Sequence, residues 1–355
     1  MEPYKAGKLP FNYEIDKELL RLSAEANLKY GEYKSLLNTL ELDASYFLDS
    51  LMLTESFKST QIEGTQISQD EMFYLKYLEK TDDNREIQNL KQALNYASER
   101  LPGGISFELV NEMHRILLNS VRGAEKNPGR IRDNQNWIGP AGCTLETATF
   151  VPPRPEEVYG LLNNLYEYMN NSYIDPILIN VALSHAQFET IHAYKDGNGR
   201  LGRTLIPVQM AILDESQPIL YMSEILELFR PSYQRNLMEL RKGNVAGYLK
   251  FFMQCVIDQC SNYIFKIERV KHIYAEDMEA IKVIKGSAIY RLMPVIKTQI
   301  VFTKKELVDS SGVSVNIVSK LVDRLVELGI LVPDSTVMKK GYRYKRIYET
   351  FVVTE

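Results

Sequence analysis

The chain has 355 residues, of which 45% are hydrophobic and 25% charged, and its formal net charge is -4. This composition is that of an average globular protein and excludes a disordered, collagen-like or coiled-coil chain. No apolar run approaches the roughly 18 residues that a membrane span needs, so we expect no membrane partner.

Length and cysteine content indicate the number of domains and the compartment. At about 150 residues per domain, the length predicts two or three domains. The N-terminus lacks the apolar core of a secretory signal, and the three cysteines have no framework spacing. These features are typical of a reducing compartment, so we expect a cytoplasmic protein.

The N-terminal part of the chain is predicted to be helical. Apolar residues recur every three or four positions over 15–55 and again over 68–100, the pattern of amphipathic helices. The second stretch ends at the breaker sequence Leu101-Pro102-Gly103-Gly104. We therefore assign 1–104 to an N-terminal helical region.

The middle of the chain alternates helices with one long irregular segment. A helix is expected over 106–118, and residues 122–155 are irregular and rich in glycine and proline. Only 144–151 within this segment resembles an edge strand or hairpin. Further helices are expected from Glu156 to Asn170, from Asp175-Pro176 to Ile191, and from Arg200 to Leu213. The second of these is apolar almost all round, as expected of a central buried helix.

A glycine-rich loop joins the two buried helices and reads His192-Ala193-Tyr194-Lys195-Asp196-Gly197-Asn198-Gly199-Arg200-Leu201-Gly202-Arg203. Its glycines permit positive φ and close backbone approach, and the N–H groups opening the next helix favour an anion. Arg200 and Arg203 share one helix face, where guanidinium groups suit phosphate. Asp196 suits magnesium beside phosphate oxygens, and His192 can serve as a base near neutral pH.

This loop resembles the motif of the Fic family, H-P-F-x-x-G-N-G-R-x-x-R, and departs from it only at Ala193 and Tyr194. The resemblance implies a mainly α-helical Fic-type core with a small β-hairpin flap. It also implies a protein adenylyltransferase, which moves AMP from ATP to a Ser, Thr or Tyr hydroxyl of a protein (AMPylation). By position, His192 would be the catalytic base and Asp196 would hold Mg2+. The residues implied to bind the phosphates are Gly197, Asn198, Gly199, Arg200, Leu201, Gly202 and Arg203.

The resemblance covers roughly residues 10–262, and we place the catalytic core at 105–262. Residues 147–151 would be the flap, which pairs with the backbone of the protein substrate by β-augmentation. Tyr233 and Asn236 resemble residues on the adenosine side of the site.

A second motif, Ser59-Thr60-Gln61-Ile62-Glu63-Gly64, matches the family's inhibitory pattern S/T-x-x-x-E-G/N. Residues 51–63 are helix-like and Gly64 suits the position just after a helix. Glu63 would then lie where the negative end of the helix dipole disfavours a carboxylate, so it needs a cation, and Ser59 can orient it. The resemblance supplies Arg203 as that cation and implies the class with an inhibitory helix N-terminal to the core.

The C-terminal part has the pattern of a winged helix-turn-helix, which we place with a linker helix at 263–355. Thr303 opens a short helix with a capping box, Ser314 caps a longer helix that ends at Gly329, and strands are expected at 330–332 and 342–348.

The charge of this module leaves its partner open. From Gly286 to Glu355 the chain carries eleven Lys or Arg and seven Asp or Glu. The predicted wing gathers five of the basic residues, which suit phosphate: Lys339, Lys340, Arg343, Lys345 and Arg346. Asp323 and Glu327 on the longer helix would instead repel DNA. Both DNA binding and protein docking are therefore retained.

Three functions fit the sequence. The first is an AMP transferase restrained by Glu63 and targeted by the C-terminal module. The second is removal of AMP, or transfer of another phosphate-containing group, on the same loop. The third is a DNA-binding regulator with a nucleotide-sensing core. Self-AMPylation and a homo-oligomer are further hypotheses that the sequence leaves open.

Overall fold

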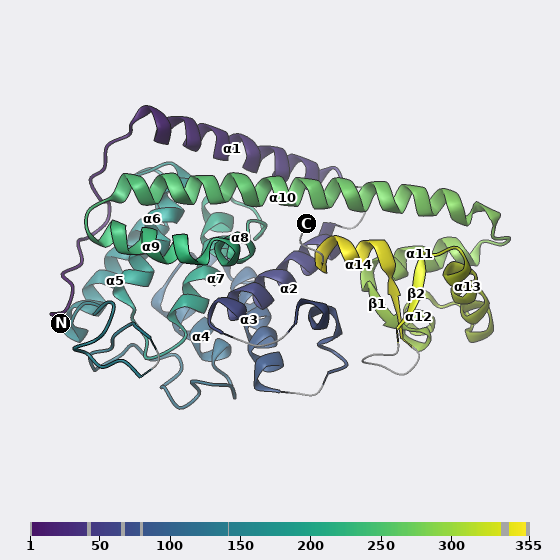
Figure 1. Ribbon diagram of the computed structural model, residues 1–355, viewed down its shortest axis with the longest axis horizontal. Coiled ribbons are helices and arrows are strands. Elements are labelled where there is room, and N and C mark those ends of the chain that lie inside the picture. The colour runs from purple at the N-terminus through teal and green to yellow at the C-terminus, as the bar shows by residue number, and fades with distance from the viewer. Residues whose placement is uncertain are drawn as a thin grey trace. The chain divides into compact units, whose positions relative to one another are not determined.

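The computed structural model describes residues 2–40, 44–64, 68–78, 81–140, 142–334 and 341–352 (Figure 1). The chain divides into two compact units. Unit 1 comprises Met1–Ser35, Leu51–Gln66 and Thr81–Ser261, and unit 2 comprises Leu36–Ser50, Ile67–Lys80 and Asn262–Glu355. Unit 1 thus combines most of the predicted N-terminal region with the predicted core, and the boundaries 1–104, 105–262 and 263–355 stay a prediction.

The described regular structure of unit 1 is helical. Its elements, three of which (α1, α2 and α10) continue into unit 2, are α1 (Lys17–Asn38), α2 (Ala44–Ile62), α3 (Asp82–Ser98), the 3₁₀ helix η2 (Leu101–Gly103), α4 (Phe107–Leu117), α5 (Pro155–Met169), α6 (Ile177–Ile191), α7 (Asn198–Leu213), α8 (Ser223–Leu228), α9 (Arg230–Arg241) and α10 (Val245–Ala280). Although α10 runs for 36 residues, no helix among the described residues has an apolar run long enough to cross a membrane.

Helices α6 and α7 form the centre of unit 1 (Figure 1). Every residue of α6 after Ile177 is buried, which confirms the expected central helix. The helices α5 and α9 pack on α6, and α3 and α4 pack on α7. Asp175, where we expect α6 to start, lies just before it, and its carboxylate accepts hydrogen bonds from the hydroxyls of Tyr13 and Tyr168, both at 2.6 Å.

The stretch 68–100 is not one helix. It contains the 3₁₀ helix η1 (Gln69–Tyr74) and then α3, which starts after Thr81. The Thr81 side chain accepts a hydrogen bond from the N–H of Asn84, so a new helix begins there.

The predicted flap strand is reduced to a single bridge. Ile138 pairs with Phe150 in one isolated antiparallel bridge, with N···O distances of 2.8 and 3.0 Å. Pro140, Pro152 and Pro153 follow the paired residues and carry no N–H group, so the ladder cannot extend. We call residues 138–151, apart from the undescribed residue 141, the flap segment.

The first residues of the chain have no regular secondary structure but are held on unit 1. The N–H of Tyr4 donates to the carbonyl of Val151 at 2.9 Å. Leu9 exchanges two hydrogen bonds with the side chain of Asn164, at 2.8 and 2.9 Å. The N-terminal segment therefore contacts the end of the flap segment.

Unit 2 contains a small sheet, whose strands alternate along the chain with helices. Its further elements are the 3₁₀ helix η3 (Ile281–Val283), α11 (Ala288–Gln299), β1 (Val301–Thr303), α12 (Lys304–Ser311), α13 (Val315–Glu327), β2 (Leu331–Asp334), β3 (Gly341–Tyr344) and α14 (Lys345–Val352). The strands form an antiparallel sheet in the order β1-β3-β2. Thr303 makes the predicted capping box with Glu306, and Gly312 ends α12 with a φ of 64°.

The predicted strand 342–348 is wrong beyond Tyr344. Lys345 begins α14, in which Ile347, Tyr348 and Phe351 are buried on one face at helical spacing. Arg346 therefore lies on a helix rather than on a wing, and it forms ion pairs with Glu276 and Asp277, both at 2.5 Å. Lys339 and Lys340 lie outside the described residues.

Candidate active site

The glycine loop turns the chain from α6 into α7 with two left-handed residues. His192 ends α6 with a φ of 48°, and Gly197 precedes α7 with a φ of 75°. The helix begins at Asn198, two residues earlier than predicted, and no side chain caps its first turn. Its N–H groups are thus available to an anion.

A cavity of about 520 Å³ lies beside this loop. Five predicted site residues line it, namely His192, Gly199, Arg203, Tyr233 and Glu63. The rest of its wall comes mainly from the flap segment and α9, and includes Ile138, Phe150, Gln234, Leu237, Met238 and Arg241. A polar end and an apolar side in one cavity are typical of a small-molecule site.

Glu63 and Arg203 form an ion pair in this cavity. Glu63 Oε1 lies 2.8 Å from Arg203 Nη2, and the Arg203 side chain is 2% exposed. Burial opposes ionisation of Glu63, but the charge and hydrogen bond of Arg203 outweigh it and hold the Glu63 pKa below its ordinary value. A Cβ at Gly199 would collide with Glu63 Oε1, so a larger residue there would displace the carboxylate from the first turn of α7.

Ser59 orients Arg203 rather than Glu63. Its hydroxyl accepts a hydrogen bond from Arg203 Nε at 3.0 Å, and its carbonyl accepts one from Arg203 Nη2 at 2.9 Å. The sequence motif placed Ser59 and Glu63 one turn apart, but packing of α2 against α7 directs both onto the same guanidinium.

Arg200 does not line the cavity. Its buried guanidinium lies 3.2 Å from Glu86 on α3 and 3.4 Å from Asp196. Glu86 is itself buried. The sequence did not reveal Glu86, because nothing in α3 distinguishes it from the other acidic residues of that helix.

Asp196 has a side chain that remains available for a cation. Its Oδ1 accepts hydrogen bonds from the N–H of Gly197 at 2.6 Å and from Arg200 at 3.4 Å, and the side chain is 35% exposed. A single carboxylate supplemented by substrate oxygens fits the ligand preference of Mg2+.

His114, which the sequence did not reveal, holds the backbone of the loop. Its Nδ1 accepts a hydrogen bond from the N–H of Gly129 at 2.7 Å, and its Nε2 therefore donates to the carbonyl of Asp196 at 2.9 Å. Burial lowers the pKa of His114 to about 4, so the ring is neutral.

The side chain of Asn198 is committed to the loop rather than to the cavity. Its amide donates to the carbonyl of Tyr194 at 2.7 Å and accepts from the N–H of Tyr194 at 2.8 Å. The Tyr194 ring stacks on His114 with centroids 4.0 Å apart, so the aromatic residue fills the core. Asn198 thus shapes the loop that would bind phosphate.

We expect Asn198→Ala to lower the free energy of unfolding by about 2 kcal/mol, because it leaves the buried N–H of Tyr194 without its partner, while the carbonyl of Tyr194 keeps only the hydrogen bond from Asn136. Urea unfolding measures this. The matched control is Asn163→Ala, whose exposed amide donates only to Glu167 on α5. An unchanged urea midpoint for Asn198→Ala would show that the amide does not hold the loop.

His192 lies at the polar end of the cavity as a neutral imidazole. Burial and the charge of Arg241 lower its pKa to about 4. Its Nδ1 is buried and has no hydrogen-bond partner among the described residues. The buried Arg132, which sequence reasoning missed, donates to the His192 carbonyl at 3.0 Å and fixes this end of α6.

The remaining predicted residues divide into two groups. Tyr233 is buried at the cavity, where its hydroxyl donates to His185 Nε2 at 2.8 Å while His185 Nδ1 donates to the carbonyl of Gly202. Gly197, Leu201, Gly202 and Asn236 do not line the cavity. Asn236 donates instead to the carbonyl of Ser232, one turn earlier on α9.

Two cavity residues escaped the sequence analysis. Burial raises the pKa of Glu189 to about 7. Arg241 donates to the carbonyl of Glu189 at 3.1 Å and lies 3.8 Å above the ring of Phe150. The spacing of Glu189 and His192 along one face of α6 is a signal that could have found Glu189.

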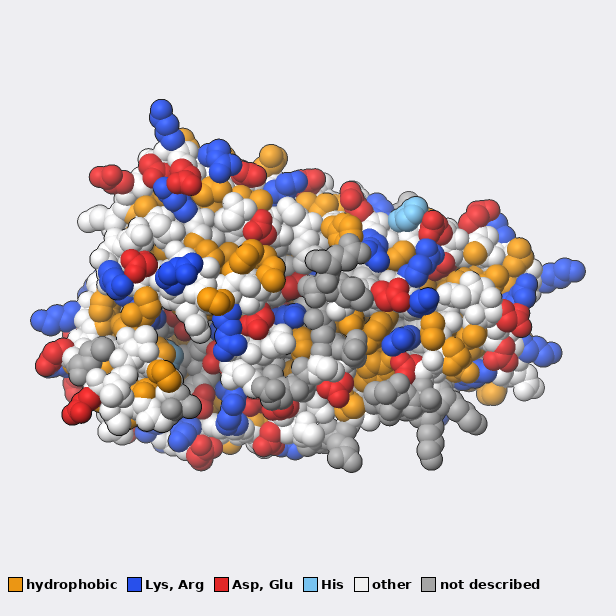
Figure 2. Space-filling model, in the orientation of Figure 1, with side chains coloured by type: hydrophobic (Ala, Val, Ile, Leu, Met, Phe, Trp, Pro, Cys, Tyr) orange, Lys and Arg blue, Asp and Glu red, His pale blue; other side chains and the backbone are white. Residues whose placement is uncertain are grey.

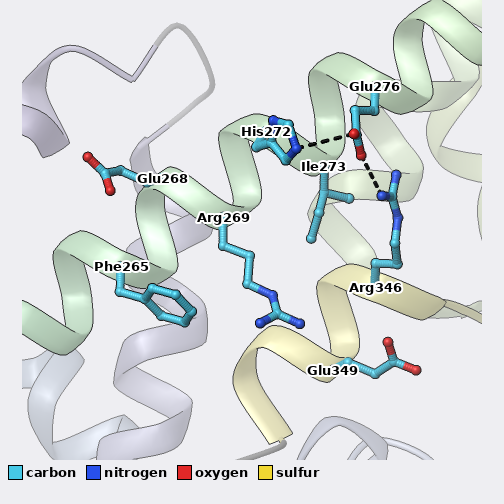
Figure 3. Close-up of a pocket in the computed structure, with 8 residues that line it drawn as sticks. All are labelled: Phe265, Glu268, Arg269, His272, Ile273, Glu276, Arg346 and Glu349. Atoms are coloured by element: carbon cyan, nitrogen blue, oxygen red, sulfur yellow. Dashed lines mark hydrogen bonds and ion pairs between the residues drawn. The ribbon is translucent and has the colours of Figure 1, made fainter. Parts of the chain in front are cut away.

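Unit 2 has a cavity of its own, drawn in Figure 3. Three of its polar side chains form one cluster, in which Glu276 contacts both Arg346, at 2.5 Å, and His272, at 3.2 Å. The guanidinium of Arg269 lies 5.8 Å from the ring of Phe265. This mixed, exposed surface lacks the buried charges of the cavity in unit 1.

Comparison with known families matches two regions of the chain. The Fic/DOC family matches residues 104–210, and the Fic/DOC family N-terminal region matches residues 20–99. The two ranges together cover more than half of the chain.

Curated relatives carry related names. Protein adenylyltransferase fic-1 of Caenorhabditis elegans is 31% identical over 140 residues, which are 39% of this chain and 25% of the relative. Protein adenylyltransferase Fic of Aedes aegypti is 23% identical over 196 residues, 54% of this chain and 36% of the relative. The chain therefore spans well under half of the length of these two relatives.

Solved structures share the fold. A Fic family protein from Desulfovibrio desulfuricans G20 aligns with a TM-score of 0.60 and 15% identity over 94% of this chain and 97% of that one. Residues 134–508 of Fic-1 from C. elegans align with a TM-score of 0.51 and 17% identity over 71% and 72% of the two chains.

Proposed function

Because the chain belongs to the Fic/DOC family, we propose that it is a protein adenylyltransferase that moves AMP from ATP to a Ser, Thr or Tyr hydroxyl of a protein. The observation that carries this proposal is one cavity lined by a neutral histidine, the first turn of α7 and the buried Arg203. These are the groups that transfer of a phosphate-linked nucleotide requires.

The proposed reaction uses His192 as the base. Its neutral ring takes the proton of the attacking hydroxyl, and the hydroxyl oxygen forms a bond to the α-phosphorus of ATP. The bond from the α-phosphorus to the bridging oxygen breaks, and pyrophosphate leaves with that electron pair. The ring of His192 is unprotonated before the attack, which is the state that a base requires.

The phosphates would lie at the first turn of α7. The N–H groups at this helix terminus and the guanidinium of Arg203 suit an anion. Asp196 would hold Mg2+, which supplies positive charge to the phosphates when bound. Arg200, paired with Glu86, would act mainly by holding the loop in shape.

Glu63 would restrain the reaction from the position proposed for the phosphates, the first turn of α7. Its carboxylate occupies the first turn of α7 and binds Arg203, so a negative group already stands where a phosphate would lie. ATP would then bind with its phosphates displaced from the attack geometry. This arrangement supports an autoinhibited enzyme.

The protein substrate would lie along residues 147–151 of the flap segment. The carbonyl of Val151 is already bound by Tyr4, so the backbone before it is the part that a substrate would meet. The adenosine would lie on the side of the cavity that Tyr233, Leu237 and Met238 line.

Intact-protein mass spectrometry tests the proposed activity. The protein and a lysate are incubated with Mg2+ and either ATP or UTP, and AMP transfer to a hydroxyl adds about 329 Da. An AMP adduct formed from ATP supports the proposal. If the adduct is on the protein itself, it indicates self-AMPylation. A UMP adduct alone, or release of AMP from a modified protein without any transfer, would contradict it.

For the C-terminal module we propose docking on a protein rather than on DNA. At the start of α13, Val315 is 64% exposed and Ile317 is 44% exposed. Lys304 pairs with Asp323 at 2.9 Å and Arg324 with Glu327 at 2.5 Å, so these basic side chains are neutralised. On the face drawn in Figure 2, acidic and basic side chains are interspersed.

We expect no binding of a mixed-sequence DNA duplex below about 10 µM at low salt, because DNA affinity depends on unneutralised Lys and Arg. Fluorescence anisotropy of a labelled duplex measures this. Salt-dependent binding that the double variant Lys304→Ala, Lys305→Ala weakens would contradict protein docking and support a DNA contact.

A further inference from the structure

We propose that Glu189 recognises the sugar of the nucleotide, with its carboxylate accepting a hydrogen bond from a ribose hydroxyl. This inference rests on the proposed function, since it states which part of ATP the residue reads. The roles proposed for the glycine loop, from His192 to Arg203, concern the proton, Mg2+ and the phosphates and leave the sugar without a partner.

The carboxylate of Glu189 accepts no hydrogen bond from the described residues, although the charges of Arg203 and Arg241 act on it. The side chain is 7% exposed and lines the cavity of the site. Oε1 is buried without a hydrogen bond, and within the described parts of the chain no hydrogen bond or ion pair reaches either oxygen. Buried polar groups are nearly always hydrogen-bonded, so an exception in a cavity wall indicates a ligand that supplies the donor.

The surroundings of Glu189 accommodate the acid specifically. A Cβ at Gly202 would lie 2.6 Å from Glu189 Oε1, so a larger residue at this point of α7 would displace the carboxylate. Arg241 fixes the residue from the other side through its hydrogen bond to the Glu189 carbonyl. The backbone of Glu189 is therefore held in place, while its carboxylate accepts no hydrogen bond from the described residues.

The chemistry of a nucleoside triphosphate narrows what the carboxylate can accept. Phosphate oxygens and the ring nitrogens of adenine are acceptors, and the phosphates would also repel a carboxylate. The remaining donors are the two ribose hydroxyls and the adenine amino group. An acidic side chain on a ribose hydroxyl is a recurrent solution in nucleotide-binding folds.

Position selects the ribose over the amino group. Glu189 lies one turn before His192 on α6, and Gly199 and Arg203 line the same end of the cavity. The ribose is joined directly to the α-phosphate that His192 would face, whereas the amino group lies at the far edge of the base. The apolar residues Leu237 and Met238 line the side suited to the base.

Calorimetric binding of ATP, 2′-deoxy-ATP and 3′-deoxy-ATP to the full chain at about pH 8.5, where Glu189 with its pKa of about 7 is ionised, tests this inference. The parent is Glu63→Gly, in which Arg203 is released. We expect at least one deoxy analogue to bind the parent about ten- to thirtyfold more weakly than ATP, the range of a charge-assisted hydrogen bond. Glu189→Gln, which keeps the shape and loses the charge, should reduce that ratio to about threefold or less.

Two controls make the result specific. Glu239→Gln makes the same change at an acid of α9 that does not line the cavity and pairs with Lys242, and it should leave the ratio as in the parent. A triphosphate of unsubstituted purine riboside, which lacks the amino group, forms a separate arm. The inference is wrong if, for both deoxy analogues, the affinity ratio to ATP is the same in the parent and in Glu189→Gln. It is also wrong if Glu189→Gln reduces only the discrimination between ATP and purine riboside triphosphate.

The test also separates this inference from the proposed function. Binding is measured without turnover, and AMP transfer is followed separately by the mass shift. Intact AMP transfer with unchanged deoxy ratios would overturn the role of Glu189 alone. If Glu189→Gln reduces the deoxy ratios but the parent transfers no AMP, sugar recognition is supported and the adenylyltransferase proposal is overturned.

Discussion

Replacing Glu63 with glycine is expected to raise AMP transfer by about ten- to a hundredfold. The carboxylate binds Arg203 at 2.8 Å and stands over the first turn of α7, where a phosphate would lie. A hydrogen bond between charged groups is worth about 1.5–3 kcal/mol, and each 1.4 kcal/mol is a factor of ten. Without the carboxylate, Arg203 can bind a phosphate instead, and this contact stabilises ATP in its reactive geometry by a similar free energy.

Incorporation of radiolabelled AMP from ATP into the protein itself and into lysate proteins measures this increase. The matched control is Gln61→Ala, also on α2, whose side chain accepts a hydrogen bond from Lys58 at 3.3 Å, does not line the cavity and should leave the rate unchanged. An equal or lower rate in Glu63→Gly would refute autoinhibition. If the variant instead loses the ability to remove AMP from a modified protein, Glu63 serves the reverse reaction.

Replacing His192 with alanine should lower AMP transfer by about 10²- to 10⁴-fold, the usual contribution of a general base. The change is made in the Glu63→Gly variant, so that the parent rate is high enough to measure. ATP affinity should change by less than about threefold, because Arg203 and the helix terminus of α7 are untouched. Single-turnover transfer and calorimetric ATP binding give the two numbers.

His272→Ala is the matched histidine control. This residue is exposed, pairs only with Glu276 in unit 2, and should leave both numbers as in the parent. Full transfer by His192→Ala would rule out its role as base. A parallel loss of ATP binding would mean that the imidazole holds the nucleotide rather than the proton.

The loop and the inhibitory motif were readable from the sequence because each is continuous. The residues from His192 to Arg203 have fixed spacing, and two glycines around Asn198 already indicate a turn before a helix terminus. The mainly helical fold and the buried α6 followed equally well, since apolar periodicity within one helix reports its burial.

Short elements were less readable. β1 has three residues, too few to show an alternating pattern, and the flap segment pairs through one bridge because prolines follow it. The strand predicted over 342–348 extends only to Tyr344, because three buried side chains on one face make residues 345–352 the helix α14. Such segments take their structure from what they pack against.

The direction of each polar side chain depended on packing between helices that are distant in the chain. Local spacing assigned Ser59 to Glu63, Asn198 to phosphate and Arg200 to the cavity. In the folded chain Ser59 binds Arg203, Asn198 binds Tyr194, and Arg200 pairs with Glu86.

Glu189 and Arg241 entered the site for the same reason, because α6, α7 and α9 meet there. A sequence records which groups lie on one helix face, and therefore which chemistry is available. Burial then forces every polar group to find a partner, and that partner comes from whichever helix packs beside it.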